Sequence, residues 1–496
     1  MRGIGEKFTV NAATGTAGLS IPLPTSPGRG GQGPAVSLSY SSGAGNGPFG
    51  LGFDLSVPKV TRKTDKGLPR YLDDAESDIY VLSGAEDLVP VVDSNGYPVP
   101  LDRTTHFAYR YRPRTEGLFA RIERWVEKAT KDAHWRVTTR DNVTNIYGTS
   151  GATRIVDPAD SAKTFEWLLE ETRDDKGNIT LYEYKAEDGA GVDPTRLSEK
   201  SRFDYASANP AFTATAQRYL KRVFYGNRVP GTGSTPSDFL FELVFDYGEH
   251  AVATSSSVPT PAEAQSWPVR EDPFSSYRSG FEVRTYRLCQ RALMFHRFDT
   301  TPLFVRATEF TYEPHPAFTY LVSVTQAGYL FDTTTSTWTR GEMPRLDLDY
   351  QRPEFYDKLS VVPEVSLAGL TGGADGRRKQ WVDLDGEGIA GLLIEEGPGW
   401  FYKENRGGGE LLPPRLLPTQ PAPGSLMRGQ QKLEDIDGDG RLELVSYEQR
   451  FSGYFTRTED GGFEPLRGFR SLPNIDWNDP NLRVIDLDGD GHADLL

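Results

Sequence analysis

The sequence predicts an all-β protein, with a large antiparallel β-rich domain followed by the first blades of a β-propeller. Short runs with strand-type alternation recur along the first two thirds of the chain, and helical periodicity is hard to find. The 51 Gly and 35 Pro residues are spread along the chain, which is typical of many turns between short strands. In the last third an acidic motif occurs three times at even spacing, as expected of propeller blades.

The predicted first domain covers residues 1–355. The segment Val36–Tyr40 alternates with period two, and Gly43–Gly52 forms a Gly-rich connector. The segment Phe165–Thr172 fits either a short helix or a buried strand, and residues 251–266 are expected to form an exposed loop. Further strands are expected at Ile79–Leu82, Leu88–Val92, His106–Tyr111, Arg121–Val126, Trp135–Thr139, Ile179–Tyr184, Tyr219–Tyr225, Phe239–Tyr247 and Phe281–Leu288.

The predicted second domain covers residues 356–496. Its motif begins at Asp383, Asp435 and Asp486, a period of 51–52 residues, and each copy runs into an apolar strand. A propeller needs at least about four blades to close. The sequence contains two blades and part of a third, so we expect the propeller to be incomplete. The three copies read Asp383-Leu384-Asp385-Gly386-Glu387-Gly388, Asp435-Ile436-Asp437-Gly438-Asp439-Gly440 and Asp486-Leu487-Asp488-Gly489-Asp490-Gly491.

The acidic loops are candidate Ca²⁺ sites, because carboxylates at loop positions 1, 3, 5 and 9 can converge on one hard cation. The first copy has Glu387 at position 5 and Gly391 at position 9, so we expect it to bind weakly or not at all. The alternative is that all three loops are metal-free turns held by Asx hydrogen bonds. The candidate ligands are Asp435, Asp437, Asp439 and Glu443 in the second copy, and Asp486, Asp488, Asp490 and Asp494 in the third.

Composition excludes several functional classes. The net charge is −15 and no Lys/Arg-rich run stands out, so the basic footprint of a nucleic-acid-binding protein is missing. Cys289 is the single cysteine, so no intrachain disulfide can form. The N-terminus has no apolar segment of the Sec signal type, and no run approaches the ~18 apolar residues of a membrane-spanning helix.

Motifs for catalysis are also missing. Three GxGxxG matches begin at Gly28, Gly45 and Gly386, but none opens a convincing helix, which a dinucleotide site requires. The six histidines are scattered, and the sequence contains no HExxH, GxSxG or Walker A motif. We therefore predict that the chain is not an enzyme, with no catalytic residue and no cofactor other than Ca²⁺.

The N-terminal segment resembles the N-terminal domain of the SpvB (plasmid-virulence) family, which also opens the B component of ABC-type (Tc) insecticidal toxin complexes. The resemblance is dense over residues 3–92 and looser to about residue 355, and Phe53 stands where the family often has Trp. The segments that carry it are Gly5-Glu6-Lys7-Phe8, Ile21-Pro22-Leu23-Pro24, Leu38–Gly52, Thr61–Tyr71 and Gly84-Ala85-Glu86-Asp87-Leu88.

Two later features resemble the Tc B component in particular. The segments Trp381–Leu393 and Trp400–Asn405 are similar to the middle region of that family, where FG-GAP/VCBS-type repeats build the propeller. The turn Asp175–Asn178, with Tyr182 and Tyr184, looks like one RHS/YD-type repeat near residues 174–184.

The resemblance implies a non-catalytic scaffold of a secreted bacterial toxin complex, made in the bacterial cytoplasm and released without a Sec signal. Its first domain would be part of a shell around a cytotoxic effector, and its propeller would dock on the pore-forming component. The implied partners are a C-type RHS component that carries the effector and the pore-forming A component, without nucleic acid and without direct membrane insertion. Two alternatives remain open: the N-terminal module of an actin ADP-ribosylating toxin of the SpvB type, or a surface adhesin with integrin-like repeats.

Overall fold

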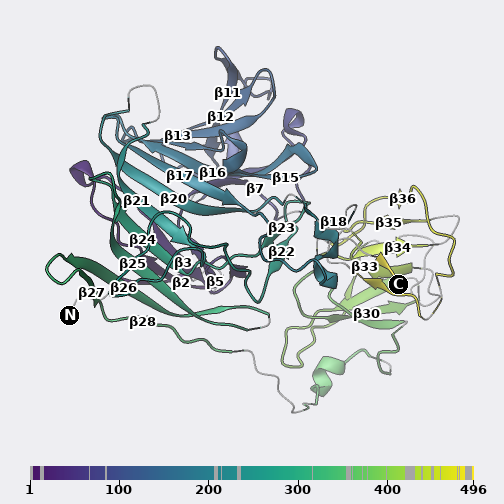
Figure 1. The fold of residues 1–496 in the computed structure, drawn as a ribbon. Coiled ribbons are helices and arrows are strands. Elements are labelled where there is room, and N and C mark those ends of the chain that lie inside the picture. The colour runs from purple at the N-terminus through teal and green to yellow at the C-terminus, as the bar shows by residue number, and fades with distance from the viewer. Residues whose placement is uncertain are drawn as a thin grey trace. The chain divides into compact units, whose positions relative to one another are not determined.

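The computed structural model describes the chain as an almost purely β-structured protein (Figure 1). The described residues are all except 1–3, 12–15, 66, 84–86, 206–210, 214, 232–235, 316, 353–358, 360, 371, 377, 398, 419–430, 437–439, 448–451, 459, 478, 480 and 486–493. Within them every helix is a short 3-10 turn, and none is long and apolar enough to cross a membrane. The all-β fold class predicted from the sequence is confirmed.

Contacts divide the chain into two compact units, Met1–Tyr350 and Gln351–Leu496. The first unit contains four of the 3-10 turns: η1 Arg29–Gly31, η2 Asp73–Ala75, η3 Gly151–Thr153 and η4 Leu197–Arg202. Its strands are β1 Lys7–Asn11, β2 Thr16–Pro22, β3 Ser37–Ser41, β4 Asn46–Gly47, β5 Gly50–Leu51, β6 Phe53–Leu55, β7 Lys59–Arg62, β8 Tyr80–Leu82, β9 Asp87–Pro90, β10 Pro100–Asp102, β11 His106–Pro113, β12 Arg121–Glu127, β13 Ala133–Thr138, β14 Thr144–Tyr147, β15 Arg154–Asp157, β16 Asp160–Arg173, β17 Ile179–Ala186, β18 Phe203–Asp204, β19 Ala211–Phe212, β20 Arg218–Asn227, β21 Phe239–Asp246, β22 Phe274–Ser276, β23 Val283–Thr285, β24 Arg291–His296, β25 Leu303–Glu313, β26 Tyr320–Asp332, β27 Thr337–Glu342 and β28 Leu346–Asp347.

Eight strands of the first unit close into a ring of antiparallel pairs. The order is β7, β8, β9, β11, β12, β13, β14 and β16, and the ring closes where Trp167 of β16 lies opposite Val60 of β7. Side chains fill the interior: the rings of Tyr80, Tyr111, Trp135 and Trp167 are buried, and their neighbouring centroids lie 4.9–6.1 Å apart. The ring is therefore a packed core, as in other small closed sheets.

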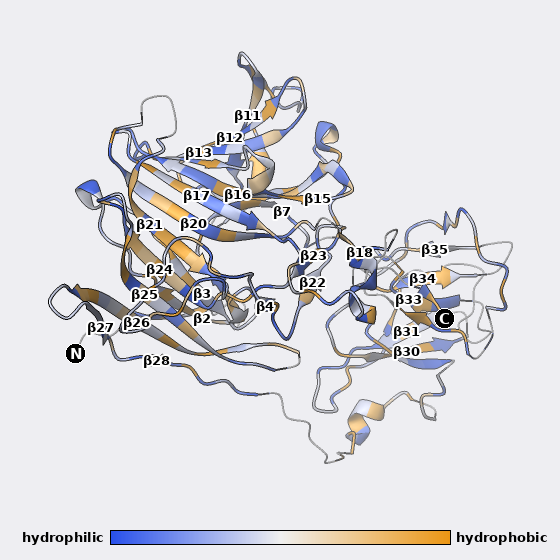
Figure 2. Ribbon diagram, viewed as in Figure 1, coloured by the Kyte–Doolittle hydropathy of each residue, from blue (hydrophilic) through white to orange (hydrophobic). Residues whose placement is uncertain are grey.

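Strand β16 belongs to the ring and to a second, open sheet. One edge of β16 pairs with β15 and β14, while the other pairs first with β7 and then with β17. From β17 the sheet continues through β20, β21, β24, β25 and β26 to β27 and β28. Hydrophobic residues are concentrated along β21, whose residues are nearly all buried (Figure 2).

A small N-terminal sheet, in the order β1-β2-β3-β6, packs its apolar face into the main core. The Gly-rich connector predicted at Gly43–Gly52 contains the short hairpin β4–β5 and not a phosphate-binding loop before a helix. Two of its glycines are required sterically: a Cβ on Gly47 would lie 2.5 Å from the Phe53 carbonyl oxygen, and a Cβ on Gly52 would lie 2.4 Å from the Tyr40 ring.

The second unit contains two consecutive four-stranded antiparallel sheets, in the orders β29-β30-β31-β32 and β33-β34-β35-β36. They share one core, in which Leu384 and Trp400 of the first repeat pack in the same cluster as Leu444 and Phe455 of the second. The elements are η5 Glu364–Leu367, β29 Lys379–Val382, β30 Gly391–Glu396, β31 Gly399–Lys403, β32 Arg415–Leu416, β33 Gln431–Glu434, β34 Glu443–Ser446, β35 Gly453–Phe455, β36 Arg467–Gly468, β37 Val484–Ile485 and β38 Asp494–Leu495.

Two expectations need adjustment. Residues 165–172, left open between helix and strand, lie wholly within strand β16. The strand expected at Phe281–Leu288 is shorter, because β23 spans only Val283–Thr285. Cys289 follows it outside a strand and is fully buried, with its thiol near the carbonyl oxygens of Asp246 and Arg291.

Candidate functional site

Two kinds of acidic cluster qualify as candidate cation sites. The repeat loops of the second unit were predicted from the sequence. The structure adds a buried cluster in the first unit, formed by Asp246, Glu249 and His250, whose ligand atoms lie within 4.8 Å of one another. A metal ion is needed to neutralise a carboxylate only where hydrogen-bond donors and cationic side chains of the protein do not already do so. The contacts of each carboxylate therefore indicate whether a metal ion is needed there.

In the first repeat loop, backbone and side-chain donors already surround the carboxylates. Asp383 accepts hydrogen bonds from the backbone amides of Glu387 and Gly388, at 2.9 and 2.6 Å. Asp385 forms ion pairs with Arg415 and with Arg457, the latter at 3.0 Å. Because Arg457 comes from the second repeat, this carboxylate joins the two repeats and is neutralised by guanidinium groups.

In the second loop, the two described candidate ligands turn toward the loop backbone. Asp435 accepts a hydrogen bond from the Gly440 amide at 2.9 Å, and Glu443 accepts one from the Ile436 amide at 3.2 Å. Glu443 is 2% exposed and is the first residue of β34. The other two candidates, Asp437 and Asp439, lie outside the described residues.

In the third loop, Asp494 is the first residue of β38 and is exposed. Asp486, Asp488 and Asp490 lie outside the described residues, as does His492, at loop position 7. The spacing of the carboxylates therefore remains the argument for Ca²⁺ in these loops, and Ca²⁺ binding there stays a prediction.

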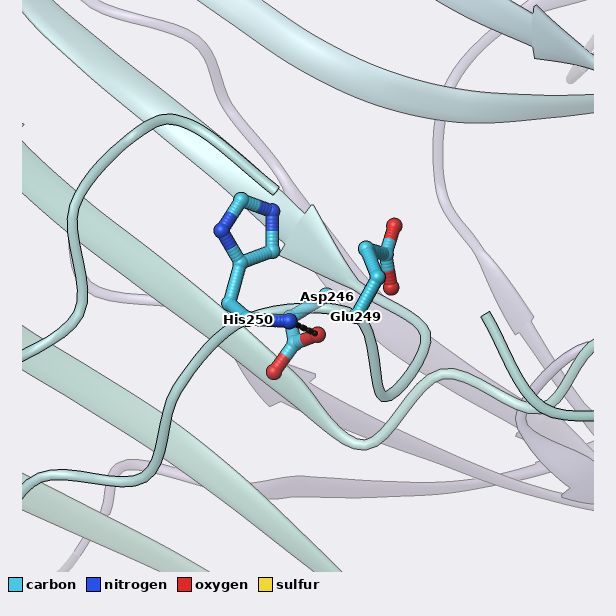
Figure 3. Close-up of side chains that lie close together, drawn as sticks. All are labelled: Asp246, Glu249 and His250. Atoms are coloured by element: carbon cyan, nitrogen blue, oxygen red, sulfur yellow. Dashed lines mark hydrogen bonds between the residues drawn. The ribbon is translucent and has the colours of Figure 1, made fainter. Parts of the chain in front are cut away.

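The buried cluster is built by the end of strand β21 and the turn that follows it (Figure 3). Asp246 is the last residue of β21, and the backbone amide of His250 donates to its carboxylate at 3.1 Å. Asp246 also accepts from the Gly248 amide at 2.8 Å and from Arg291 Nε at 2.7 Å. Together the Arg291 guanidinium and these hydrogen bonds hold the pKa of Asp246 below its ordinary value, against the desolvation that would raise it.

Lys221, on the neighbouring strand β20, contacts two of the three residues of the cluster. Its Nζ donates to the Phe245 carbonyl at 3.0 Å, to the Glu249 carboxylate, and to His250 Nε2 at 2.9 Å. His250 Nδ1 lies 3.0 Å from the Thr260 carbonyl, which can only accept, so Nδ1 carries the proton and Nε2 is the acceptor. Burial lowers the pKa of Lys221 and of His250 and raises that of Glu249.

These contacts make the cluster a structural ion network. The Lys221 ammonium group is bonded to one oxygen of Glu249 and to His250 Nε2, and the remaining oxygen of Glu249 accepts from the Tyr247 amide at 2.6 Å. A divalent cation would have to displace a buried lysine that donates three hydrogen bonds. The sequence analysis missed this network because Lys221 lies 28 residues before Glu249 and reaches it only through the pairing of β20 with β21.

Comparison with known proteins decides the family. The family described as "Salmonella virulence plasmid 65kDa B protein" matches residues 11–298, which is more than half of the chain. The chain belongs to the SpvB family. The match lies within the first unit, where it covers the ring, strands β2, β3 and β6 of the small N-terminal sheet, and the open sheet through β24. A second family, the FG-GAP-like repeat, matches residues 435–496, which include the second and third acidic loops.

Curated relatives and solved structures agree with the SpvB assignment. Mono(ADP-ribosyl)transferase SpvB of Salmonella typhimurium and its counterpart in Salmonella dublin are each 38% identical over 314 residues, covering 59% of this chain and 50% of the relative. The chain thus spans about half the length of the curated relatives it matches. The solved N-terminal domain of SpvB from Salmonella typhimurium is 34% identical with a TM-score of 0.55, and the match covers 63% of this chain and 98% of that domain.

Similarity to Tc toxin structures extends over nearly the whole chain. The crystal structure of TcdB2-TccC3 matches with 32% identity and a TM-score of 0.68, over 98% of this chain and 23% of that one. A Tc holotoxin pore of Photorhabdus luminescens matches with 32% identity and a TM-score of 0.66, over 100% of this chain and 23% of that one. Within SpvB itself, the matched structure is the N-terminal domain.

Proposed function

We propose that this chain is a non-catalytic scaffold segment of a secreted Tc-type toxin complex. Residues of the first unit contribute to a shell that encloses a cytotoxic effector, and the repeats of the second unit contribute to a β-propeller that docks on the pore-forming component. The partners are an RHS-containing C-type component that carries the effector and the pore-forming A component, and the assembly acts outside the producing bacterium.

One observation carries this proposal. The similarity to TcdB2-TccC3 covers 98% of the chain, whereas the curated SpvB relatives match 59% and the solved SpvB domain covers 63%. Both units, including the repeats with the acidic loops, are therefore accounted for by a Tc-type protein. The Lys221 network also supports a structural role, because its polar groups are used in internal hydrogen bonds.

The proposal can be tested by assembling the complex from its components. The chain is mixed with an RHS-containing C-type component, and complex formation is followed by size-exclusion chromatography with light scattering. We expect a stable complex in which the effector resists protease and which binds the pore-forming component. A protein that stays monomeric, or an effector that is digested as fast as it is alone, would contradict the proposal.

A second candidate is the N-terminal module of an ADP-ribosylating toxin, favoured by the 38% identity to SpvB. It predicts that a toxin of the SpvB type that contains this module modifies actin with labelled NAD. For the chain 1–496 alone we expect no labelling, because its similarity to SpvB lies in the N-terminal domain. Labelling by this chain that a point substitution within it abolishes would refute the non-catalytic assignment.

A further inference from the structure

The first unit contains a cavity of about 740 Å³ that neither candidate function uses. One wall is the Gly-rich connector and the chain after it, residues 44–49 and 52–59. The opposite walls come from strands β16, β20, β22 and β23. This volume lies within the ~300–1,000 Å³ typical of small-molecule sites.

Most of the cavity lining is apolar. Leu55 and Val57 line it from the connector side, Phe165 and Leu168 from β16, and Phe274 from β22. Such a surface favours an apolar ligand body, because burial of apolar area is the main favourable term in small-molecule binding. The polar groups among the lining residues then determine which end group the ligand carries.

Two of the cavity's charged groups already pair with each other. Lys59 Nζ lies 2.9 Å from both carboxylate oxygens of Glu166, so this pair is bidentate and neutral. Asp54 accepts a hydrogen bond from the Leu55 amide at 2.8 Å, and burial raises the pKa of its carboxyl group. Neither arrangement provides a cation for an incoming ligand.

Arg218, the first residue of β20, is the remaining cation among the charged side chains that line the cavity. Its Nη1 donates to the backbone carbonyls of Gln217, Thr215 and Ala216 at 3.0, 3.3 and 3.4 Å. Within the part of the chain that the structure describes, its guanidinium forms no ion pair with a carboxylate, and neither its Nε nor the Thr215 hydroxyl has a hydrogen-bond partner. Partial burial of a guanidinium group without a counter-ion costs free energy. An anionic ligand bound next to the guanidinium would reduce that cost.

We propose that this cavity binds a small amphipathic monoanion, with its carboxylate on Arg218 and its apolar body against the connector and β16. A single negative charge matches the single unpaired cation of the cavity, and the cavity offers no second unpaired cation for the further charges of a polyanion such as a nucleotide. The inference is independent of the proposed scaffold function, because it rests on the first unit's own residues.

The test uses the full chain and two probes of equal tail length, octanoate and octanamide, titrated by isothermal calorimetry. We expect octanoate to bind the wild-type chain, and Arg218→Gln to weaken octanoate by about tenfold or more while leaving octanamide unchanged, since one buried charge-assisted pair is lost. Arg218→Lys retains the charge and should recover part of the octanoate affinity. The matched control is Arg140→Gln, at an exposed position outside the cavity.

A second variant tests the cavity itself. Ser276→Trp places a large side chain into the lining and should abolish binding of both probes, while its circular dichroism and melting temperature show that the chain is folded. The proposal is overturned if octanoate does not bind the wild-type chain, if Arg218→Gln binds octanoate as the wild type does, or if Ser276→Trp leaves octanoate affinity intact.

Discussion

At the scale of single residues, the fold is notable for buried charges that are paired internally. Arg287 and Glu187 are both fully buried and form an ion pair, as do Arg270 and Asp272. Such pairs add little net stability over apolar residues, but removing one partner leaves an uncompensated buried charge. The Lys221 network follows the same rule and can be tested by deleting its cation.

We expect Lys221→Met to lower the free energy of unfolding by about 3–5 kcal/mol, because Glu249 then stays buried without its counter-ion. Urea denaturation measures the loss. The matched control is Lys163→Met, whose partner Asp157 lies 3.4 Å away at a position where the lysine is 42% exposed, and less than about 1 kcal/mol should be lost there. A rise in melting temperature with Zn²⁺ that His250→Ala abolishes would instead show a metal site.

His134 makes stability depend on pH. Its Nε2 accepts a hydrogen bond from Arg136 Nε at 3.1 Å, and burial, reinforced by Arg136, lowers its pKa to about 3. The folded protein therefore binds this proton less readily than the unfolded chain does. The stabilisation is complete above the ordinary histidine pKa of about 6.5 and is lost as the pH falls from there toward about 3.

The variant His134→Gln should flatten this part of the stability profile. One proton accounts for a slope of up to about 1.4 kcal/mol per pH unit between pH 6.5 and 3. Urea unfolding measured at several pH values in that window provides the comparison. A variant whose stability falls as steeply as that of the wild type would show that other groups control acid unfolding.

At the scale of elements, the sequence predicts strands well where short runs rich in aromatic and β-branched residues are bounded by turn signals. The alternating run Ile179–Tyr184 is part of β17, and Tyr219–Tyr225 lies within β20. Trp167-Leu168-Leu169 was ambiguous because it has two buried faces: Trp167 and Leu169 pack in the main core, and Leu168 packs in a separate cluster with Ile155 and Ala216.

The closure of the ring could not be predicted from local patterns. Lys59 and Glu166, which flank the closing contact of β7 with β16, are 107 residues apart, and no periodicity within either strand specifies that register. The acidic loops are the opposite case, because their candidate ligands follow from spacing alone. That Arg218 has no counter-ion could not be predicted from the sequence either. Whether a charged side chain is paired depends on which residues, distant in the sequence, the fold brings next to it.

The acidic loops yield a prediction at the element scale. We expect Ca²⁺ to bind the second and third loops, because clustered carboxylates repel one another unless a cation neutralises them. Affinities of about 10⁻⁴–10⁻³ M are typical of extracellular modules, and about 10⁻⁷–10⁻⁵ M of sensor loops. Calorimetry should show that Asp437→Ala and Asp488→Ala each remove one binding event, and a chelator should lower the melting temperature of the wild type.

The first loop supplies the internal control. In Asp385→Ala the Ca²⁺ heat should be unchanged, because this carboxylate pairs with Arg415 and Arg457, yet stability should fall as the arginines lose their partner. If Ca²⁺ changes neither heat nor melting temperature in the wild type, the loops are metal-free Asp-Gly turns.

At the scale of the whole molecule, the two units have separate cores. The main cluster lies within residues 1–350, and the cluster around Trp400 lies within the second unit. Because each core is contributed by its own segment, we expect a chain that ends at Tyr350 to fold alone. Circular dichroism should show a β-type spectrum with little helix, and urea unfolding should be cooperative. A spectrum of an unfolded chain would mean that the second unit is needed for folding.

The ring closure also determines the order in which the chain can fold. Strand β7 pairs with β8 early in synthesis, but its other edge has no partner until β16 has emerged more than 100 residues later. Contacts of such long sequence separation form slowly, because the intervening chain must first lose its freedom. During that interval the nascent chain exposes an unpaired strand edge, with which another nascent chain could pair. Correct folding therefore requires that the ring closes before two incomplete chains associate.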